Sequence, residues 1–250
     1  MKSILYSLII FFVIIINSVA FSQFHFGIKN SAKDIYAQRE LFENAKVQSA
    51  VIHFDNLDEK IMFDRAGKII GRVSYASDNE NEIDGEEIYE YDYSGNLILI
   101  RTEGGMYMEP TIFQYDSLGN MTKRITDSHD LVYFYDKNNN FIGTKLLRAL
   151  SCEVIPIDSI KYSEGLICEI KYGEFTEGDS PYDFVRELLS YDEYKRLIEI
   201  AESGESIETG KPIIISRTKI EYNEKNLPIS YISTDILGNI NVCTIIYRYF

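Results

Sequence analysis

One short turn motif recurs along the chain and constrains its fold more than any other feature. Residues 91–97 have the sequence YDYSGNL, in which an aromatic anchor is followed by Asp, then by Gly, and six positions after the anchor by an apolar residue. Shortened or partial copies occupy residues 162–166, 222–227 and 235–240. The anchor and the closing apolar residue keep the same spacing in five places, at Phe63–Ile69, Tyr91–Leu97, Tyr115–Met121, Tyr135–Phe141 and Tyr191–Leu197.

The motif predicts the tip of a β-hairpin. An Asp at the first turn position accepts hydrogen bonds from backbone N–H groups two residues further on. Gly, or Asn as second best, supplies the positive φ that a hairpin with a bulge requires. Apolar and β-branched residues flank the turns on both sides, which is typical of strands. The predicted turn residues are Asp64, Gly67, Asp92, Gly95, Asp116, Gly119, Asp136, Asn139, Asp192, Asp235 and Gly238.

Repetition of this unit predicts an all-β fold. We expect an antiparallel meander of hairpins, about fourteen strands in all, that forms a curled or extended sheet. The repeats occupy residues 47–250 as one domain, with residues 184–189 as a strand. The acidic stretches at residues 78–87 and 202–205 are interpreted as connections between strands.

A short helix is expected just before the repeats, over residues 31–44. Ser31 and Asp34 have the spacing of a capping box, and Ile35, Leu41 and Phe42 give a weak apolar stripe. Repeat arrays need capped ends. We therefore expect residues 23–46 to contain a helix that covers one end of the sheet.

The repeated unit resembles the YD repeat of the Rhs family over most of residues 54–250. This resemblance implies an extracellular or envelope-associated array of β-hairpins that wraps or presents another molecule. The resemblance does not extend to an encapsulating role, because the chain is far shorter than a full Rhs shell.

The first 22 residues are interpreted as a secretory signal. Lys2 precedes an apolar run at residues 4–16, and Ala20 and Ser22 satisfy the small-residue rule for cleavage. We expect the mature chain to begin at Gln23, to lack a transmembrane helix, and to be periplasmic, cell-envelope-associated or secreted. The alternative is an uncleaved N-terminal membrane anchor.

The charge balance excludes some partners. The chain has 25 basic and 39 acidic residues, a net charge of −14, and loses only Lys2 among the basic residues with the signal. Nucleic-acid binding depends on basic side chains that neutralise phosphates, so neither nucleic acid nor an anionic lipid surface is an expected partner. An unidentified protein or glycan of the envelope is expected instead.

Residues with characteristic chemistry form few motifs. His25, His53 and His129 are isolated, so zinc spacing is lacking, and His129 is interpreted as an exposed loop residue. No cofactor is expected. An oxygen-rich cluster gives a weak calcium candidate, made of Asp78, Glu80, Glu82 and Asp84.

The three cysteines of the chain allow one disulfide. Pairing about the turn at residues 162–166 would place Cys168 near Ile160, not near Cys152, so a Cys152–Cys168 bond is not expected. Pairings that involve Cys243 remain open, as does the possibility that all three thiols are buried and free.

Three functional hypotheses follow. The leading one is an exported, non-enzymatic binding or scaffold protein, because the signal and the repeats are present and nucleotide-binding and nucleophile motifs are missing. The second is an outer-membrane β-barrel, suggested by alternating apolar residues near Phe250 but opposed by charges in short strands. The third is a carboxylate-dependent hydrolase, which the abundance of acidic residues leaves open.

Overall fold

The computed structural model describes residues 32–54, 57–76, 79–103, 109–149, 157–172, 182–206 and 211–250. The predicted signal and His25 lie outside these ranges. Within them the chain forms one helix, α2 (Ala32–Ala45), and sixteen strands. The strands are β1 (Val47–Phe54), β2 (Leu57–Phe63), β3 (Ile69–Ala76), β4 (Asn79–Tyr91), β5 (Leu97–Glu103), β6 (Thr111–Tyr115), β7 (Met121–Ile125), β8 (His129–Tyr135), β9 (Phe141–Ala149), β10 (Ile157–Ser163), β11 (Leu166–Tyr172), β12 (Tyr182–Tyr191), β13 (Leu197–Ser206), β14 (Pro212–Tyr222), β15 (Pro228–Asp235) and β16 (Ile240–Tyr249).

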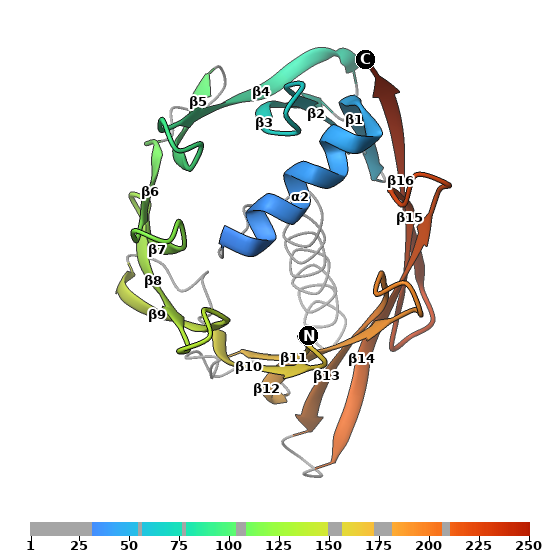
Figure 1. The fold of residues 1–250 in the computed structure, drawn as a ribbon. Helices are drawn as coiled ribbons and strands as arrows, with labels where there is room; N and C mark the ends of the chain where they lie inside the picture. The colour runs from blue at the N-terminus through green and yellow to red at the C-terminus, as the bar shows by residue number, and fades with distance from the viewer. Residues whose placement is uncertain are drawn as a thin grey trace.

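The strands form a single antiparallel meander that curls into a nearly closed, barrel-like sheet (Figure 1). The predicted all-β hairpin meander is therefore confirmed. The two ends of the repeat domain meet, because β16 pairs with β1 through contacts such as Ala50↔Tyr247 and Ile52↔Ile245. The order of the sheet begins at β10 and ends at β9. Hydrogen bonds that each involve one side chain connect β9 and β10, the two strands at the ends of this order. The Ile157 backbone N–H donates to Thr144 Oγ1 at 2.8 Å, and the Tyr162 hydroxyl donates to the Phe141 carbonyl at 2.8 Å.

Two predicted connections are wrong, because both segments are extensions of strands in the sheet. Residues 79–87 belong to β4, where Glu87 pairs with Arg72, and residues 202–205 belong to β13, where Glu202 pairs with Ser216. Acidic composition suggested loops at both places. A neighbouring strand can nevertheless supply backbone hydrogen bonds to such a segment and polar partners to its side chains.

The hairpin turns share one hydrogen-bond pattern. Asp136 Oδ1 accepts from the backbone N–H of Asn138 and of Asn140, each at 2.8 Å, and the Asn140 side-chain amide donates to Oδ2 at 3.0 Å. The backbone N–H of Asn140, and then its amide, lower the pKa of Asp136. The fourth turn position has positive φ in the seven turns that begin with Asp or Asn, at Gly67, Gly95, Gly119, Asn139, Lys195, Asn226 and Gly238, whereas the shorter turn at residues 162–166 has positive φ at Glu164 and Gly165.

The aromatic anchors form a ring of hydrogen bonds on the inner side of the sheet. Each of these hydroxyls donates to a carbonyl at or next to the start of a strand in the preceding hairpin, so the hydrogen bonds join consecutive hairpins. The pairs are Tyr91–Ile69 at 2.6 Å, Tyr135–Met121 at 2.8 Å, Tyr162–Phe141 at 2.8 Å, Tyr191–Ile167 at 2.9 Å, Tyr222–Leu197 at 2.7 Å and Tyr247–Pro228 at 2.8 Å.

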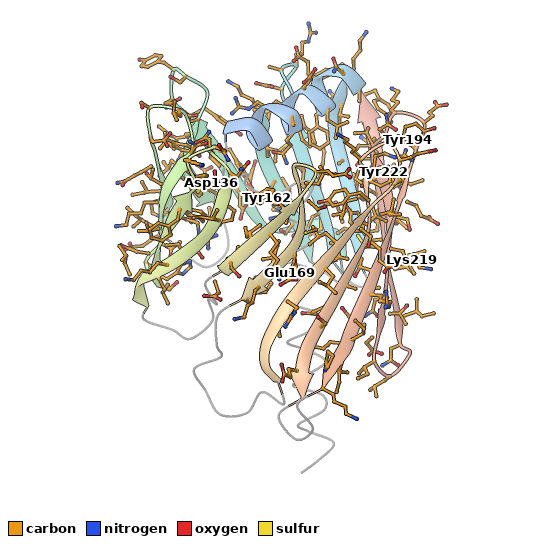
Figure 2. All side chains as sticks on the ribbon, turned by 60° about the horizontal axis from the view of Figure 1, so that its bottom comes forward. Asp136, Tyr162, Glu169, Tyr194, Lys219 and Tyr222 are labelled. Atoms are coloured by element: carbon orange, nitrogen blue, oxygen red, sulfur yellow. The ribbon has the colours of Figure 1, made fainter. Side chains whose placement is uncertain are left out.

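Helix α2 lies at the end of the sheet where the hairpin tips gather, Asp136 among them (Figure 2). Phe42 is buried in the larger hydrophobic core, and its ring centroid lies 4.5 Å from that of Phe63. Gly67 is needed where the helix crosses a turn, because an added Cβ would lie 2.2 Å from the Arg39 carbonyl oxygen. The sequence predicted a short helix over residues 31–44, and the observed helix begins and ends one residue later. No helix within the described ranges has the length and apolar character needed to cross a membrane.

Candidate functional site

Three glutamates occupy the same position relative to the hairpin anchors. Glu59, Glu87 and Glu187 each come four residues before an anchor, which is Phe63, Tyr91 or Tyr191. Successive residues of a strand alternate between its faces. An inward anchor therefore places the residue four positions earlier on the inner face as well. The sequence contained this signal, but the functional interpretation considered only the turn residues.

On one side of the ring, strands β2, β3 and β4 neutralise their inward glutamates. Arg72 donates to Glu59 Oε2 from Nη2 at 2.6 Å and from Nε at 3.1 Å. Arg72 is also directly opposite Glu87 in the sheet. The Tyr89 hydroxyl donates to Glu87 Oε2 at 2.7 Å. We call Glu59, Arg72, Glu87 and Tyr89 the arginine wall.

Strands β11 to β14 carry a comparable group without a cation. Glu187 is directly opposite Glu202, and both are buried, with 2% and 3% of their surfaces exposed. The Ser216 hydroxyl donates to Glu202 Oε2 at 3.0 Å, and the Tyr172 hydroxyl hydrogen-bonds the Glu187 carboxyl. Glu187 Oε2 has no hydrogen-bond partner among the described residues. We call Tyr172, Glu187, Glu202 and Ser216 the glutamate wall.

The environment of the glutamate wall disfavours negative charge. Burial, and then the charge of Glu202, raises the pKa of Glu187 to about 7. Burial also raises the pKa of Glu202 to about 7, against the hydrogen bond from Ser216. Two adjacent carboxyls titrate as a pair. This pair therefore exchanges protons near neutral pH and can become a buried anionic acceptor for a cation.

A third polar group on the inner face surrounds His129. This residue is 6% exposed, so its interpretation as an exposed loop residue is wrong. Its Nε2 lies 2.9 Å from Arg124 Nη2, and its Nδ1 lies 2.9 Å from Ser128 Oγ. Because a guanidinium can only donate, Nε2 accepts and the neutral imidazole carries its proton on Nδ1. The group holds the start of β8, and within it the buried Arg124 Nε has no hydrogen-bond partner among the described residues. His53 is separate and lies 2.8 Å from Asp58.

A cavity of about 440 Å³ opens at the hairpin tips between the turns at residues 92–96 and 116–120. Strands β5 and β6 pair only through Leu99↔Ile112 and Ile100↔Thr111, so the tips of the adjoining hairpins are not held together by a backbone ladder. The tyrosine ring is interrupted at this place, because the buried Tyr115 hydroxyl has no hydrogen-bond partner among the described residues. Arg39 of α2 lines the cavity and donates to the Gly95 carbonyl.

The residues predicted to bind calcium are not brought together in any described arrangement. Asp78 lies outside the described residues, and the side chains of Glu80, Glu82 and Asp84 are not described, so calcium binding stays a prediction. Within the described part of the chain, no group of three or more His, Cys, Asp or Glu residues is placed to hold a metal ion. Cys168 and Cys243 form no disulfide within the described ranges, and Cys152 lies outside them.

Comparison with known proteins yields only distant structural likenesses. No protein-family model matches the chain, and no curated protein matches it in sequence. A TcdB2-TccC3-TEV structure shares 12% identity over 78% of this chain at a TM-score of 0.33, and this chain spans only 13% of its length. A porin-like protein from Bacteroides uniformis shares 9% identity over 81% of this chain and 98% of its own, at a TM-score of 0.37.

A putative outer membrane lipoprotein-sorting protein domain from Vibrio parahaemolyticus shares 8% identity over 82% of this chain and 89% of its own, at a TM-score of 0.28. All three structures fall below a TM-score of 0.5, so they identify no function for this chain. The resemblance to YD repeats therefore rests on the turn motifs.

Proposed function

We propose that this chain is an exported, non-enzymatic binding protein of the cell envelope or the secreted fraction, and that it holds its ligand inside the barrel-like sheet. Closed sheets of about eight strands are filled by their own side chains, whereas wider ones enclose additional space. This sheet has sixteen strands and a helix across one end. Such an architecture favours an internal ligand over a flat docking surface.

The observation that carries the proposal is the glutamate wall. A buried polar atom without a partner costs free energy, on the order of 1–3 kcal/mol, so such atoms are rare away from functional sites. Glu187 Oε2 is such an atom, and it belongs to a carboxyl pair on the inner face of the sheet. A ligand that supplied the missing donor would recover this cost.

The same geometry speaks against the hydrolase hypothesis. Enzymes that use two carboxyls as acid and base place them in different environments, which separate their pKa values. Here both environments are buried and raise the pKa values of Glu187 and Glu202 alike, to about 7. No observation in the structure therefore assigns one of these carboxyls as the acid and the other as the base of a glycoside hydrolase.

An outer-membrane barrel is the second candidate. Outward isoleucines that follow the turns favour it, namely Ile70, Ile98, Ile142 and Ile198. Ion pairs on the same outer face oppose it, because charges facing lipid are costly. Arg101 pairs with Glu90 at 2.7 Å, and Lys161 pairs with Glu169 at 2.9 Å. Figure 2 places Glu169 and Lys219 on the outside of the ring.

Fractionation and native mass spectrometry test the two candidates together. The full chain is expressed in a bacterium with an envelope, and each fraction is probed with an antibody. We expect release by osmotic shock without detergent, and a mass above that of the polypeptide that disappears after mild denaturation. Recovery only in detergent-extracted membranes would contradict the proposal and favour the barrel hypothesis. Recovery of the bare polypeptide from every envelope extract would contradict internal binding.

A further inference from the structure

We propose that the glutamate wall binds the primary ammonium group of an amphipathic organic cation, with Glu187 and Glu202 as the anionic acceptors. This inference rests on the proposed function, because it names the chemical class of the internal ligand. The geometry points to a cation, since two buried carboxyls oppose each other and one oxygen lacks a donor. A buried carboxylate requires a proton or a cation as its partner.

The arginine wall indicates how this chain supplies a cation when the site is structural. There the strand opposite the glutamate provides Arg72, which reaches Glu59 at 2.6 Å. In the glutamate wall the opposite strand provides a second acid, Glu202, and no described basic side chain forms an ion pair with either carboxyl. A cation that neutralises the pair therefore has to come from outside the described part of the chain.

The charged neighbours of the pair do not fill this role. On β12, Arg186 adjoins Glu187 in sequence, so alternation turns it to the outer face. On β11, Lys171 is directly opposite Arg186 and pairs with Asp158 at 3.2 Å. The other groups that face the pair are hydroxyls, from Tyr172 on β11, Ser216 on β14 and Thr218 on β14.

A primary ammonium suits this site better than a metal ion. Hard metal ions require about six or more oxygen ligands, mostly carboxylates and carbonyls, whereas the described wall offers two carboxyls and two hydroxyls. An ammonium has three donors, and these match the free oxygen of Glu187 and the carboxyl of Glu202. Apolar side chains of the same inner face flank the pair and would contact the alkyl group of such a ligand, namely Ile170, Val185, Leu189 and Ile200.

Binding of this kind competes with a proton. An alkylammonium has an unperturbed pKa near that of Lys, about 10.4, so it stays charged between pH 6 and 8. The carboxyl pair loses a proton in the same range, and linkage requires binding to strengthen as that proton leaves. We expect the dissociation constant of an alkylammonium to be about tenfold larger at pH 6 than at pH 8.

Calorimetry with n-hexylammonium on the full exported protein tests the inference. We expect one site at pH 8, weaker binding at pH 6, and no binding of n-hexanol, which has the same alkyl chain without the charge. Titrations at pH 6.5 in buffers of different ionisation enthalpy should show proton release on binding. Absence of hexylammonium binding at pH 8, or binding without proton release, would overturn the inference.

Variants locate the site. Glu187→Gln and Glu202→Gln keep the side-chain shape and remove the charge, so each should weaken hexylammonium binding at least tenfold. Glu199→Gln is the matched control, because this outward carboxylate on β13 pairs with Arg217 at 2.6 Å. Equal binding by folded Glu187→Gln and wild type would also overturn the inference. A different ligand recovered from the envelope, without hexylammonium binding, would refute the ammonium assignment and leave the proposed function standing.

Discussion

The arginine wall and the glutamate wall each contain a glutamate at the same position of the repeat, but the residue opposite that glutamate is basic in the first wall and acidic in the second. Glu59, Glu87 and Glu187 all come four residues before an aromatic anchor, so alternation turns all three to the inner face. In the arginine wall the adjacent strand offers Arg72, which donates to Glu59 and lies directly opposite Glu87. In the glutamate wall the adjacent strand offers Glu202, and both carboxyls favour the protonated form. The residue on the opposite strand, and not the position in the repeat, therefore determines whether a glutamate has a cationic partner.

Removal of Arg72 should convert the first wall into a copy of the second, with the largest effect on stability. Arg72→Met keeps the aliphatic bulk and leaves Glu59 and Glu87 inward without a cation. We expect a loss of roughly 2–4 kcal/mol of unfolding free energy at pH 8, and less at pH 5, where the carboxyls can take up protons. Urea denaturation at both pH values measures the difference.

The control for Arg72→Met is Arg101→Met on the outer face. Arg101 pairs with Glu90 at 2.7 Å, and both side chains are about half exposed. Pairs of this kind contribute about 0–1 kcal/mol. If the two variants lost the same stability, the contrast between inner and outer charges would be wrong.

Removing the charges of the glutamate wall should raise the unfolding free energy at pH 8, whereas removing Arg72 should lower it. Because the pKa values of Glu187 and Glu202 rise from 4.5 to about 7, the folded chain holds protons that the unfolded chain releases. The protonated pair therefore makes its full contribution to wild-type stability below pH 4.5, and this contribution is lost as the pH rises to about 7. The double variant Glu187→Gln/Glu202→Gln should therefore be more stable than wild type at pH 8, by roughly 1–3 kcal/mol.

Denaturation of the double variant and of wild type across pH 5 to 8, without ligand, measures this gain. The difference between them should grow with pH and vanish near pH 5. Five turn aspartates lie outside this window, because hydrogen bonds from their own turns lower their pKa values, namely Asp92, Asp116, Asp136, Asp192 and Asp235. A double variant less stable than wild type at pH 8 would mean that the wall is already neutralised by a group in the chain.

The tyrosine ring extends the same comparison to uncharged groups, with the smallest expected effect. The Tyr135 hydroxyl donates to the Met121 carbonyl at 2.8 Å, whereas the Tyr115 hydroxyl is buried without a partner among the described residues. Tyr135→Phe should cost about 1 kcal/mol, because it leaves a carbonyl without its donor. Tyr115→Phe should be neutral or slightly stabilising.

Thermal denaturation of these two single-atom deletions at one pH provides the measurement. The variants share ring shape and position in the repeat, so their difference isolates the hydrogen bond. A Tyr115→Phe loss as large as that of Tyr135→Phe would indicate that Tyr115 has a partner that the described residues do not include.

The sequence determined the local parts of this protein. Each turn is closed by contacts within five residues, such as Asn140 to Asp136, so its motif was sufficient to predict hairpins and a meander. The helix near residue 32 was also predictable, because its signals are local. Acidic composition misled at residues 79–87 and 202–205, where strand pairing with a neighbour overrode a loop-like sequence.

Only the tertiary structure decided how the sheet closes and which glutamate receives a cation. Pairing of β1 with β16 joins residues about two hundred positions apart, and no local signal specifies it. The state of Glu187 depends on the register that sets it opposite Glu202, since a shift of one residue would turn one carboxyl to the other face. Turn chemistry acts over a few residues, whereas burial and charge pairing depend on strands that the chain brings together from far apart.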